Sequence, residues 1–168
     1  MLIMGIDPGI AISGYGLVNN KNYKNTVIEY GVLRTNSGIS MPKRLEYIFN
    51  GYMELIRKYS PEAIAVEELF FNKNAKTIIT VGQARGAALL AASLMNIEVF
   101  EYTPLQVKQA VVGYGRAEKI QIQEMTRILL NLKELPKPDD AADALAVALC
   151  HINSFRLQSV INNNGERS

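Results

Sequence analysis

Four carboxylates stand where apolar segments of this chain end, or where a helix is expected to begin. Asp7 closes the first apolar segment and Glu67 falls near the end of another, while Asp140 and Asp143 lie three residues apart. Carboxylates gathered in one place repel one another unless cations bind between them. Oxygen ligands suit Mg²⁺ or Mn²⁺. Two such ions about 3.5–4 Å apart can clamp a phosphodiester, one activating water and the other stabilising the leaving oxygen.

Each of these acids also has an ordinary explanation. Asp7 precedes Pro8-Gly9, and Asp-Pro-Gly is common turn chemistry, so Asp7 alone is an even choice between turn former and ligand. Asp139 and Asp140 could complement a helix dipole, and the other acids could be solvated charges. The occurrence of all of them together favours a shared site.

Hydrophobic periodicity and turn residues predict the elements that must position these acids. The predicted strands cover residues 1–7, 10–18, 26–35, 63–68 and 98–102. The predicted helices cover about 42–59, 75–95, 104–112 and 117–130, and a last helix with Asp139 as its N-cap runs to about Phe155. Three antiparallel strands followed by strands that alternate with helices predict an α/β domain with a mixed sheet. Sites in such sheets form beyond the carboxyl ends of the parallel strands.

Strand geometry suggests how the acids meet. Side chains alternate along a strand, so Asp7 shares a face with Gly5, and Glu67 shares a face with Ala65. Neighbouring strands would put both acids above a patch of small residues, which selects Glu67 rather than Glu68 as the inward acid. The alanine-rich last helix is thin enough to approach that patch. Its Asp140 and Asp143 are three residues apart, so their Cβ atoms lie about 5–6 Å apart on one face of the helix.

Composition limits the class of protein. The 168 residues predict one domain over residues 1–155 and a polar, flexible tail over 156–168. No membrane-spanning segment or signal sequence is expected, so the protein is predicted to be cytoplasmic. Cys150 is the only cysteine and is expected in the core. The net charge of +2 is a weak hint of an acidic partner. If several acids are gathered in one site, the rest of the surface is more basic than this total suggests.

Seven short motifs occur in a fixed order along the chain. They are GIDPG at 5–9, GYG at 14–16, AVEELF at 65–70, GQARG at 82–86, VKQ at 107–109, GYGRAEK at 113–119 and DAADALA at 140–146. With this ordered set the chain resembles the RuvC family of Holliday-junction resolvases over residues 1 to about 155. The resemblance implies an RNase H-like fold, with a mixed five-stranded sheet and helices on both faces.

The resemblance also implies an activity and its partners. Asp7, Glu67, Asp140 and Asp143 would be the metal-binding catalytic acids, holding Mg²⁺, or Mn²⁺ as the alternative, with two ions per subunit during catalysis. A homodimer would cut four-way junction DNA by paired symmetric nicks in recombination and repair, leaving 5′-phosphate and 3′-hydroxyl ends. A RuvA–RuvB branch-migration complex is the implied protein partner.

Basic and aromatic residues are the candidates for DNA contact. Lys108 and Lys119 match lysines that are important in the family. Lys119 stands near a helix start, where it does not complement the dipole, so contact with a phosphate explains it better than a solvated lysine does. Phe70 matches a family aromatic that interacts with junction bases, and Phe71 is expected in the core, although the two could exchange. Further candidates for backbone contact are Lys73, Lys76, Arg85 and Arg116.

Gly82 and Gly86 share one face of a predicted apolar helix. Packing within the chain is one explanation, and a dimer interface that places two sites for symmetric cuts is the other. His151 is predicted to lie about 12 Å along the last helix from Asp143, so it is given no metal role.

Two other functions compete with a nuclease. An actin- or Hsp70-like nucleotide-binding module also begins with a Gly-x-Asp-x-Gly strand, but it needs a second similar domain that 168 residues do not hold. A junction-binding protein without catalysis is the other, and the intact acids argue against it.

Overall fold

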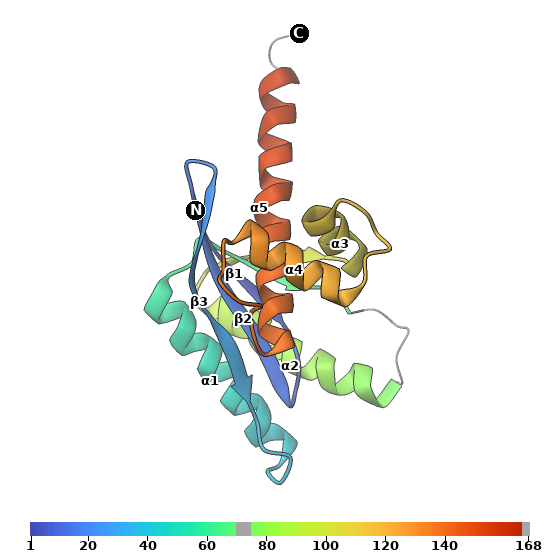
Figure 1. The fold of residues 1–168 in the computed structure, drawn as a ribbon. Coiled ribbons are helices and arrows are strands. Elements are labelled where there is room, and N and C mark those ends of the chain that lie inside the picture. The colour runs from blue at the N-terminus through green and yellow to red at the C-terminus, as the bar shows by residue number, and fades with distance from the viewer. Residues whose placement is uncertain (70–74, 166–168) are drawn as a thin grey trace.

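The computed structural model describes the backbone of residues 1–69 and 75–165, and the side chains of residues 1–69 and 77–155. The strands are β1 (Leu2–Asp7), β2 (Ile12–Lys21), β3 (Lys24–Arg34), β4 (Ala63–Glu67) and β5 (Glu98–Tyr102). The helices are α1 (Met41–Tyr59), α2 (Ala75–Leu94), α3 (Pro104–Val112), α4 (Lys119–Leu129) and α5 (Asp139–Gly165) (Figure 1). The type and order of the predicted elements are confirmed.

The strands form one mixed sheet in the order β3-β2-β1-β4-β5. β1, β2 and β3 make an antiparallel meander, while β4 runs parallel to both β1 and β5. Gly5 pairs with Ala65, and Ile6 with Val66. Asp7 and the acid at the end of β4 therefore emerge next to each other, at the carboxyl ends of two parallel neighbours.

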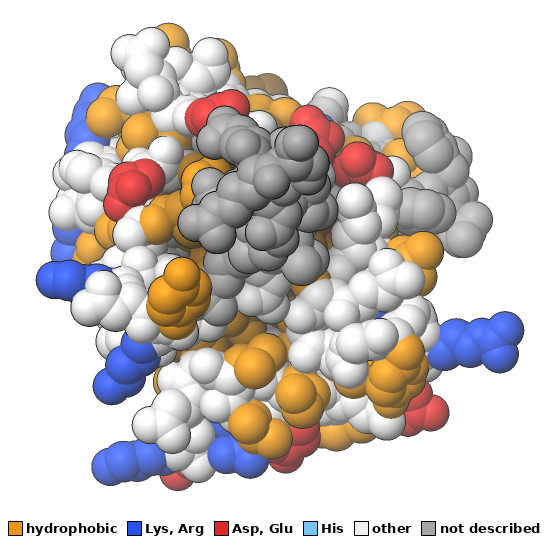
Figure 2. Space-filling view, turned by 90° about the horizontal axis from the view of Figure 1, so that it is seen from above, with side chains coloured by type: hydrophobic (Ala, Val, Ile, Leu, Met, Phe, Trp, Pro, Cys, Tyr) orange, Lys and Arg blue, Asp and Glu red, His pale blue; other side chains and the backbone are white. Residues whose placement is uncertain are grey.

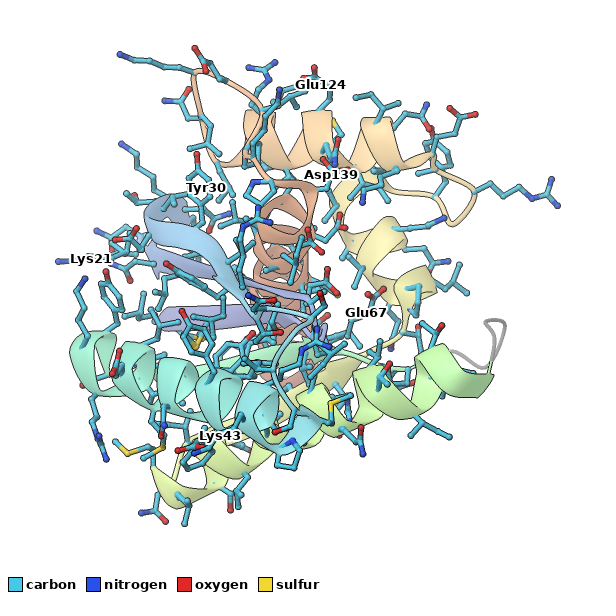
Figure 3. The ribbon with its side chains drawn as sticks, turned by 90° about the horizontal axis from the view of Figure 1, so that it is seen from below. Lys21, Tyr30, Lys43, Glu67, Glu124 and Asp139 are labelled. Atoms are coloured by element: carbon cyan, nitrogen blue, oxygen red, sulfur yellow. The ribbon has the colours of Figure 1, made fainter. Side chains whose placement is uncertain are left out.

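Helices cover both faces of the sheet and bury a separate core on each. On one face, α5 with α3 and α4 encloses residues such as Ile3, Ala65 and Leu149. On the other face, α1 and α2 enclose Met4 and Tyr52 among others. Figure 3 shows α1 and α2 together in one layer, with α5 and α4 on the opposite side. The expected fold class, an RNase H-like mixed sheet with helices on both faces, is confirmed.

Glycines on β1 and β2 let α5 lie directly on the sheet. A Cβ added to Gly5 would stand 1.9 Å from the Ala144 carbonyl oxygen, and one added to Gly14 would stand 2.0 Å from the Asp140 carbonyl oxygen. On the helix, Ala141 and Ala144 are fully buried. The predicted approach of a thin alanine-rich helix to small strand residues is therefore correct.

α5 differs from its predicted course at both ends. It begins at Asp139 itself, and the Pro138 carbonyl accepts from the N–H groups of Ala141 at 3.0 Å and Ala142 at 3.3 Å. The predicted end near Phe155 is wrong, because the helix continues to Gly165 and projects beyond the sheet (Figure 1). No proline or glycine interrupts residues 156–164, so nothing in the local sequence breaks the helix there.

α2 is a long apolar helix that is only partly covered by the rest of the chain. Its segment Thr77–Leu94 is long and apolar enough to cross a membrane by length and composition, with a mean hydropathy of 1.3. In the fold, α2 packs against α1 through buried alanines such as Ala88, and Arg85 pairs with Glu101 of β5. Only 22% of the segment is buried, so most of an apolar helix lies open on the single chain.

Candidate active site at the carboxyl ends of β1 and β4

A cleft of about 490 Å³ opens where β1 and β4 end. Asp7, Glu67 and Asp140 line it from three different elements, and its other wall includes Thr77 and Val81 of α2. A smaller cleft of about 200 Å³ lies beside it, between the end of β4 and the helices α3, α4 and α5. Glu67 borders both clefts, and so links them.

The second cleft holds the remaining predicted acid and two of the predicted lysines. Asp143 lines it one turn of α5 beyond Asp140, and Lys108 and Lys119 face it from α3 and α4. Figure 3 looks onto this end of the molecule and labels Glu67, at the end of β4, and Asp139, the first residue of α5. The structure thus places the four predicted acids around two adjoining openings at one end of the sheet.

The charges of these acids act on one another. The pKa of Asp7 is raised to about 7, first by burial and then by the charges of Asp143, Glu67 and Asp140, whereas Lys119 opposes the rise. Burial also raises the pKa of Asp143, against the hydrogen bond and charge of Lys119. Because the acids interact this strongly, they form a single electrostatic site.

Lys119 stands against the acids at the start of α4. Its Nζ lies 3.1 Å from Asp143 Oδ2 and 3.3 Å from Asp139 Oδ2. Burial lowers the pKa of Lys119, but the hydrogen bonds and charges of Asp143 and Asp139 outweigh that and raise it. The pairing with Asp139 was not predictable from the sequence, because it depends on how α4 packs beside the first turn of α5.

A divalent cation suits this set of donors. Within the described residues, no three carboxylate, histidine or cysteine side chains already converge as a metal site. The donors are nevertheless all oxygens, which hard cations prefer. A cation bound near Asp7 would also relieve the repulsion that raises its pKa. The chemistry of the site therefore fits a hard divalent cation.

Glu67, which was predicted to be the inward acid, and Glu68 lie differently with respect to the two clefts. Both line the larger cleft, but only Glu67 also borders the second cleft and acts on the pKa of Asp7. The Glu68 N–H donates to the Tyr102 carbonyl at 2.8 Å, continuing the pairing of β4 with β5.

The other predicted DNA contacts fall in different places. Arg116 is exposed in the connection between α3 and α4. The structure does not bring Arg85 to the cleft: its side chain is only 16% exposed and lies 2.5 Å from Glu101. Several predicted positions lie outside the residues whose side chains the structure describes: Phe70, Phe71, Lys73 and Lys76.

His151 is not among the described residues that line the two clefts. His151 is buried beside Tyr102, whose hydroxyl lies 2.8 Å from Nδ1, and burial lowers the pKa of the imidazole. Seen from the end at which α5 projects, lysine and arginine side chains lie around the edge, separated by hydrophobic and uncharged groups (Figure 2). The acidic clefts open at the opposite end.

A mixed sheet in this order, with one acid ending β1, one ending β4 and two more in the first turns of the helix that covers them, defines the RNase H-like class. The family model described as "Crossover junction endodeoxyribonuclease RuvC" matches residues 3–151. The chain therefore belongs to the RuvC family.

Individual relatives agree over nearly the whole chain. A crossover junction endodeoxyribonuclease RuvC from Alkaliphilus metalliredigens is 58% identical, over 95% of this chain and 98% of its own. The solved Thermus thermophilus RuvC structure is 38% identical with a TM-score of 0.88, covering 94% of this chain and 97% of that one. T. thermophilus RuvC in complex with Holliday junction substrate is 37% identical with a TM-score of 0.86, covering 94% and 96%.

Proposed function

We propose that this chain is a crossover junction endodeoxyribonuclease that resolves four-way DNA junctions by paired symmetric nicks in recombination and repair. Relatives across nearly the whole chain bear that name, and one similar solved structure holds a Holliday junction substrate. The observation that carries the proposal is the placement of four acids from three elements around two adjoining clefts. Burial and the other three acids raise the pKa of Asp7 there to about 7. Such crowding of carboxylates is characteristic of a functional site.

The proposed reaction is hydrolysis of one phosphodiester bond in each of two strands. Water adds to phosphorus, the P–O3′ bond breaks, and the proton goes to the leaving oxygen, which gives 5′-phosphate and 3′-hydroxyl ends. Asp7, Glu67, Asp140 and Asp143 would hold Mg²⁺, or Mn²⁺ as the alternative, with two ions per subunit during catalysis. When bound, the metal supplies charge that neutralises the phosphate and polarises the attacking water.

Protein groups around the acids would orient the DNA. Lys119 holds Asp143 in place through its 3.1 Å ion pair, and it presents a positive charge at the edge of the second cleft. Lys108 of α3, which also lines that cleft, would meet a backbone phosphate. Base stacking by Phe70, and backbone contacts by Arg116, Lys73 and Lys76, belong to the same proposal.

The open face of α2 supports a homodimer. Among the residues whose side chains the structure describes, a Cβ on Gly86 would meet nothing within 4 Å, and one on Gly82 would meet only the Leu69 side chain, at 3.5 Å. Close packing against this described part of the chain therefore does not explain the two glycines. Leu90 and Leu94 of the same helix are more than half exposed, at 54% and 58%. A second copy would cover these apolar groups and set two active sites for symmetric cuts.

A RuvA–RuvB complex as partner and a cytoplasmic location complete the proposal. Both rest on membership of the family rather than on a contact within this chain.

A synthetic four-way junction and a linear duplex of the same sequence, each with Mg²⁺ and with EDTA, test the proposal. We expect Mg²⁺-dependent paired nicks in the junction, product ends that ligase reseals, and little cutting of the duplex. Binding of the junction without Mg²⁺-dependent cleavage would instead show a junction-binding protein. Equal cutting of duplex and junction would contradict structure selectivity.

A further inference from the structure

A buried pair of hydroxyl groups lies behind Asp7, on the side of the sheet away from α5. Tyr52 of α1 and Ser13 of β2 are both fully buried, and their hydroxyl oxygens lie 2.7 Å apart. Neither residue lines the catalytic clefts. A buried hydroxyl costs free energy unless it is hydrogen-bonded, so the bonds that this pair makes are the reason for its place in an otherwise apolar core.

Those bonds all reach the backbone around Asp7. The Ser13 hydroxyl lies 3.4 Å from the Asp7 carbonyl, and the Gly9 N–H donates to Ser13 Oγ, also at 3.4 Å. The Tyr52 hydroxyl donates to the Gly14 carbonyl at 3.2 Å, and Gly14 is the β2 residue that pairs with Asp7. The two hydroxyl groups have two hydrogens for three contacts. If Tyr52 donates to Ser13, the Ser13 hydroxyl donates to the Asp7 carbonyl. If Ser13 donates to Tyr52, the Tyr52 hydroxyl donates to the Gly14 carbonyl.

The same backbone touches a second acid from the other side. Gly14 lies so close to α5 that an added Cβ would be 2.0 Å from the Asp140 carbonyl. The strand that Tyr52 holds is thus the surface on which the first turn of α5 rests. Burial raises the pKa of Tyr52 well above its usual range, so its hydroxyl keeps its proton at working pH.

α1 also holds the far end of the turn that follows Asp7. The Thr35 N–H donates to the Ala11 carbonyl at 3.0 Å, and the Thr35 hydroxyl donates to the Ile10 carbonyl. Arg44 Nε of α1 in turn donates to the Thr35 hydroxyl at 2.8 Å. One helix therefore supports both ends of the segment 7–11, and Tyr52 acts at the end that carries the acid.

We propose that Tyr52 and Ser13 are positioning residues that fix the backbone of Asp7 for metal binding. This inference rests on the proposed function, because it takes Asp7 to be a metal ligand. The pair touches neither the metal nor DNA. Its effect passes through the Asp7 carbonyl and the Gly9 amide to the orientation of the Asp7 carboxylate relative to Glu67.

Four variants separate positioning from general stability. Tyr52→Phe and Ser13→Ala each remove one hydroxyl, and the double variant removes both. Tyr59→Phe is the matched control, because this tyrosine of the same helix donates to Glu29 at 2.8 Å and does not line the clefts. The readouts are Mn²⁺ binding to DNA-free protein by titration calorimetry, the Mg²⁺ dependence of junction cleavage, junction binding in EDTA, and thermal stability.

Each single variant should weaken Mn²⁺ binding about 3- to 10-fold, the worth of one net hydrogen bond. The Mg²⁺ midpoint for cleavage should shift by a similar factor, with junction binding in EDTA unchanged, and Tyr59→Phe should shift neither. The double variant leaves the Gly9 N–H and the Asp7 and Gly14 carbonyls without these hydroxyl partners. It should therefore bind Mn²⁺ at least as weakly as either single variant.

Two results would overturn the inference. One is a Tyr52→Phe protein whose Mn²⁺ binding and Mg²⁺ midpoint equal those of the wild type. The other is a double variant that binds Mn²⁺ as tightly as the wild type. A wild-type protein that neither binds Mn²⁺ nor cleaves junctions would instead defeat the proposed function, so the two failures are distinguishable.

Discussion

Gly5 of β1 lies directly against Ala144 of α5, so close that a Cβ on Gly5 would stand 1.9 Å from the Ala144 carbonyl oxygen. The same Cβ would lie 2.8 Å from the Ala148 nitrogen, so both obstacles are backbone atoms that no rotamer change can move. This contact sets the height of α5 above the sheet, and with it the position of the acids in its first turn relative to Asp7.

Gly5→Ala should therefore destabilise the protein by at least about 3 kcal/mol, since overpacking against backbone forces the helix away. Gly16→Ala should cost less, because its nearest obstacle, at 2.7 Å, is the Leu145 side chain. Gly38→Ala in an exposed loop is the control and should stay within about 1 kcal/mol. Urea denaturation measures all three, and equal stabilities for Gly5→Ala and Gly38→Ala would refute the packing argument.

The raised pKa of Asp7 predicts how stability depends on pH in the absence of divalent ions. Its folded pKa of about 7 exceeds the ordinary value of 3.8, so the folded state binds more protons between these values. The stabilisation of the folded state by the protonated Asp7 is fully present below about pH 3.8 and is lost as pH rises through about 7. Asp7→Asn removes the titrating group. Its free energy of unfolding should therefore rise relative to that of the wild type by roughly 2–4 kcal/mol between pH 4 and pH 8.

Denaturation of both proteins in EDTA across this range checks the prediction. Adding Mg²⁺ at pH 8 should stabilise the wild type and not Asp7→Asn. Parallel pH profiles for the two proteins would mean that Asp7 is not the group that titrates.

Lys119 lowers the pKa of Asp7 and of Asp143. Lys119→Met should therefore shift the pH–rate profile for junction cleavage to higher pH, and slow the reaction at least about 10-fold. Lys43→Met is the control, because that lysine is exposed and pairs with Glu46 on α1. A slower reaction with an unshifted profile would show that Lys119 contacts DNA without tuning the acids.

The open face of α2 predicts a dimer that a single charge can disrupt. Leu90→Glu should give a monomer in sedimentation velocity at concentrations where the wild type is a dimer, because a buried unpaired carboxylate is costly. Ile128→Glu on α4 places the same charge on another exposed apolar residue, 55% exposed, and should leave the mass unchanged. A monomeric wild type, or a dimeric Leu90→Glu, would count against α2 as the interface.

Patterns within single segments predicted much of this molecule. Alternation placed Gly5 beneath Asp7 and Ala65 beneath Glu67, and the structure confirms that α5 uses the small residues at this point to approach. Strand ends, proline and glycine indicated where the acids emerge. These features depend on neighbours along the chain, which a sequence shows directly.

Features that depend on packing between distant segments were not predictable in this way. Arg85 was predicted to contact the DNA backbone. In the fold its side chain forms an ion pair with Glu101 of β5. The partnership of Lys119 with Asp139 requires α4 to lie beside the start of α5. Nothing local to Tyr52 in the sequence indicated that its hydroxyl would meet Ser13 behind Asp7.

The central claim is that Asp7 belongs to a metal site that cuts DNA, and single-turnover cleavage of a synthetic four-way junction by Asp7→Asn tests it most directly. Glu98→Gln removes a carboxylate at the start of β5, away from the clefts, and serves as the control. We predict that Asp7→Asn binds the junction as tightly as the wild type but cleaves it at least about 100-fold more slowly. Cleavage by Asp7→Asn at a rate close to that of Glu98→Gln would contradict the account.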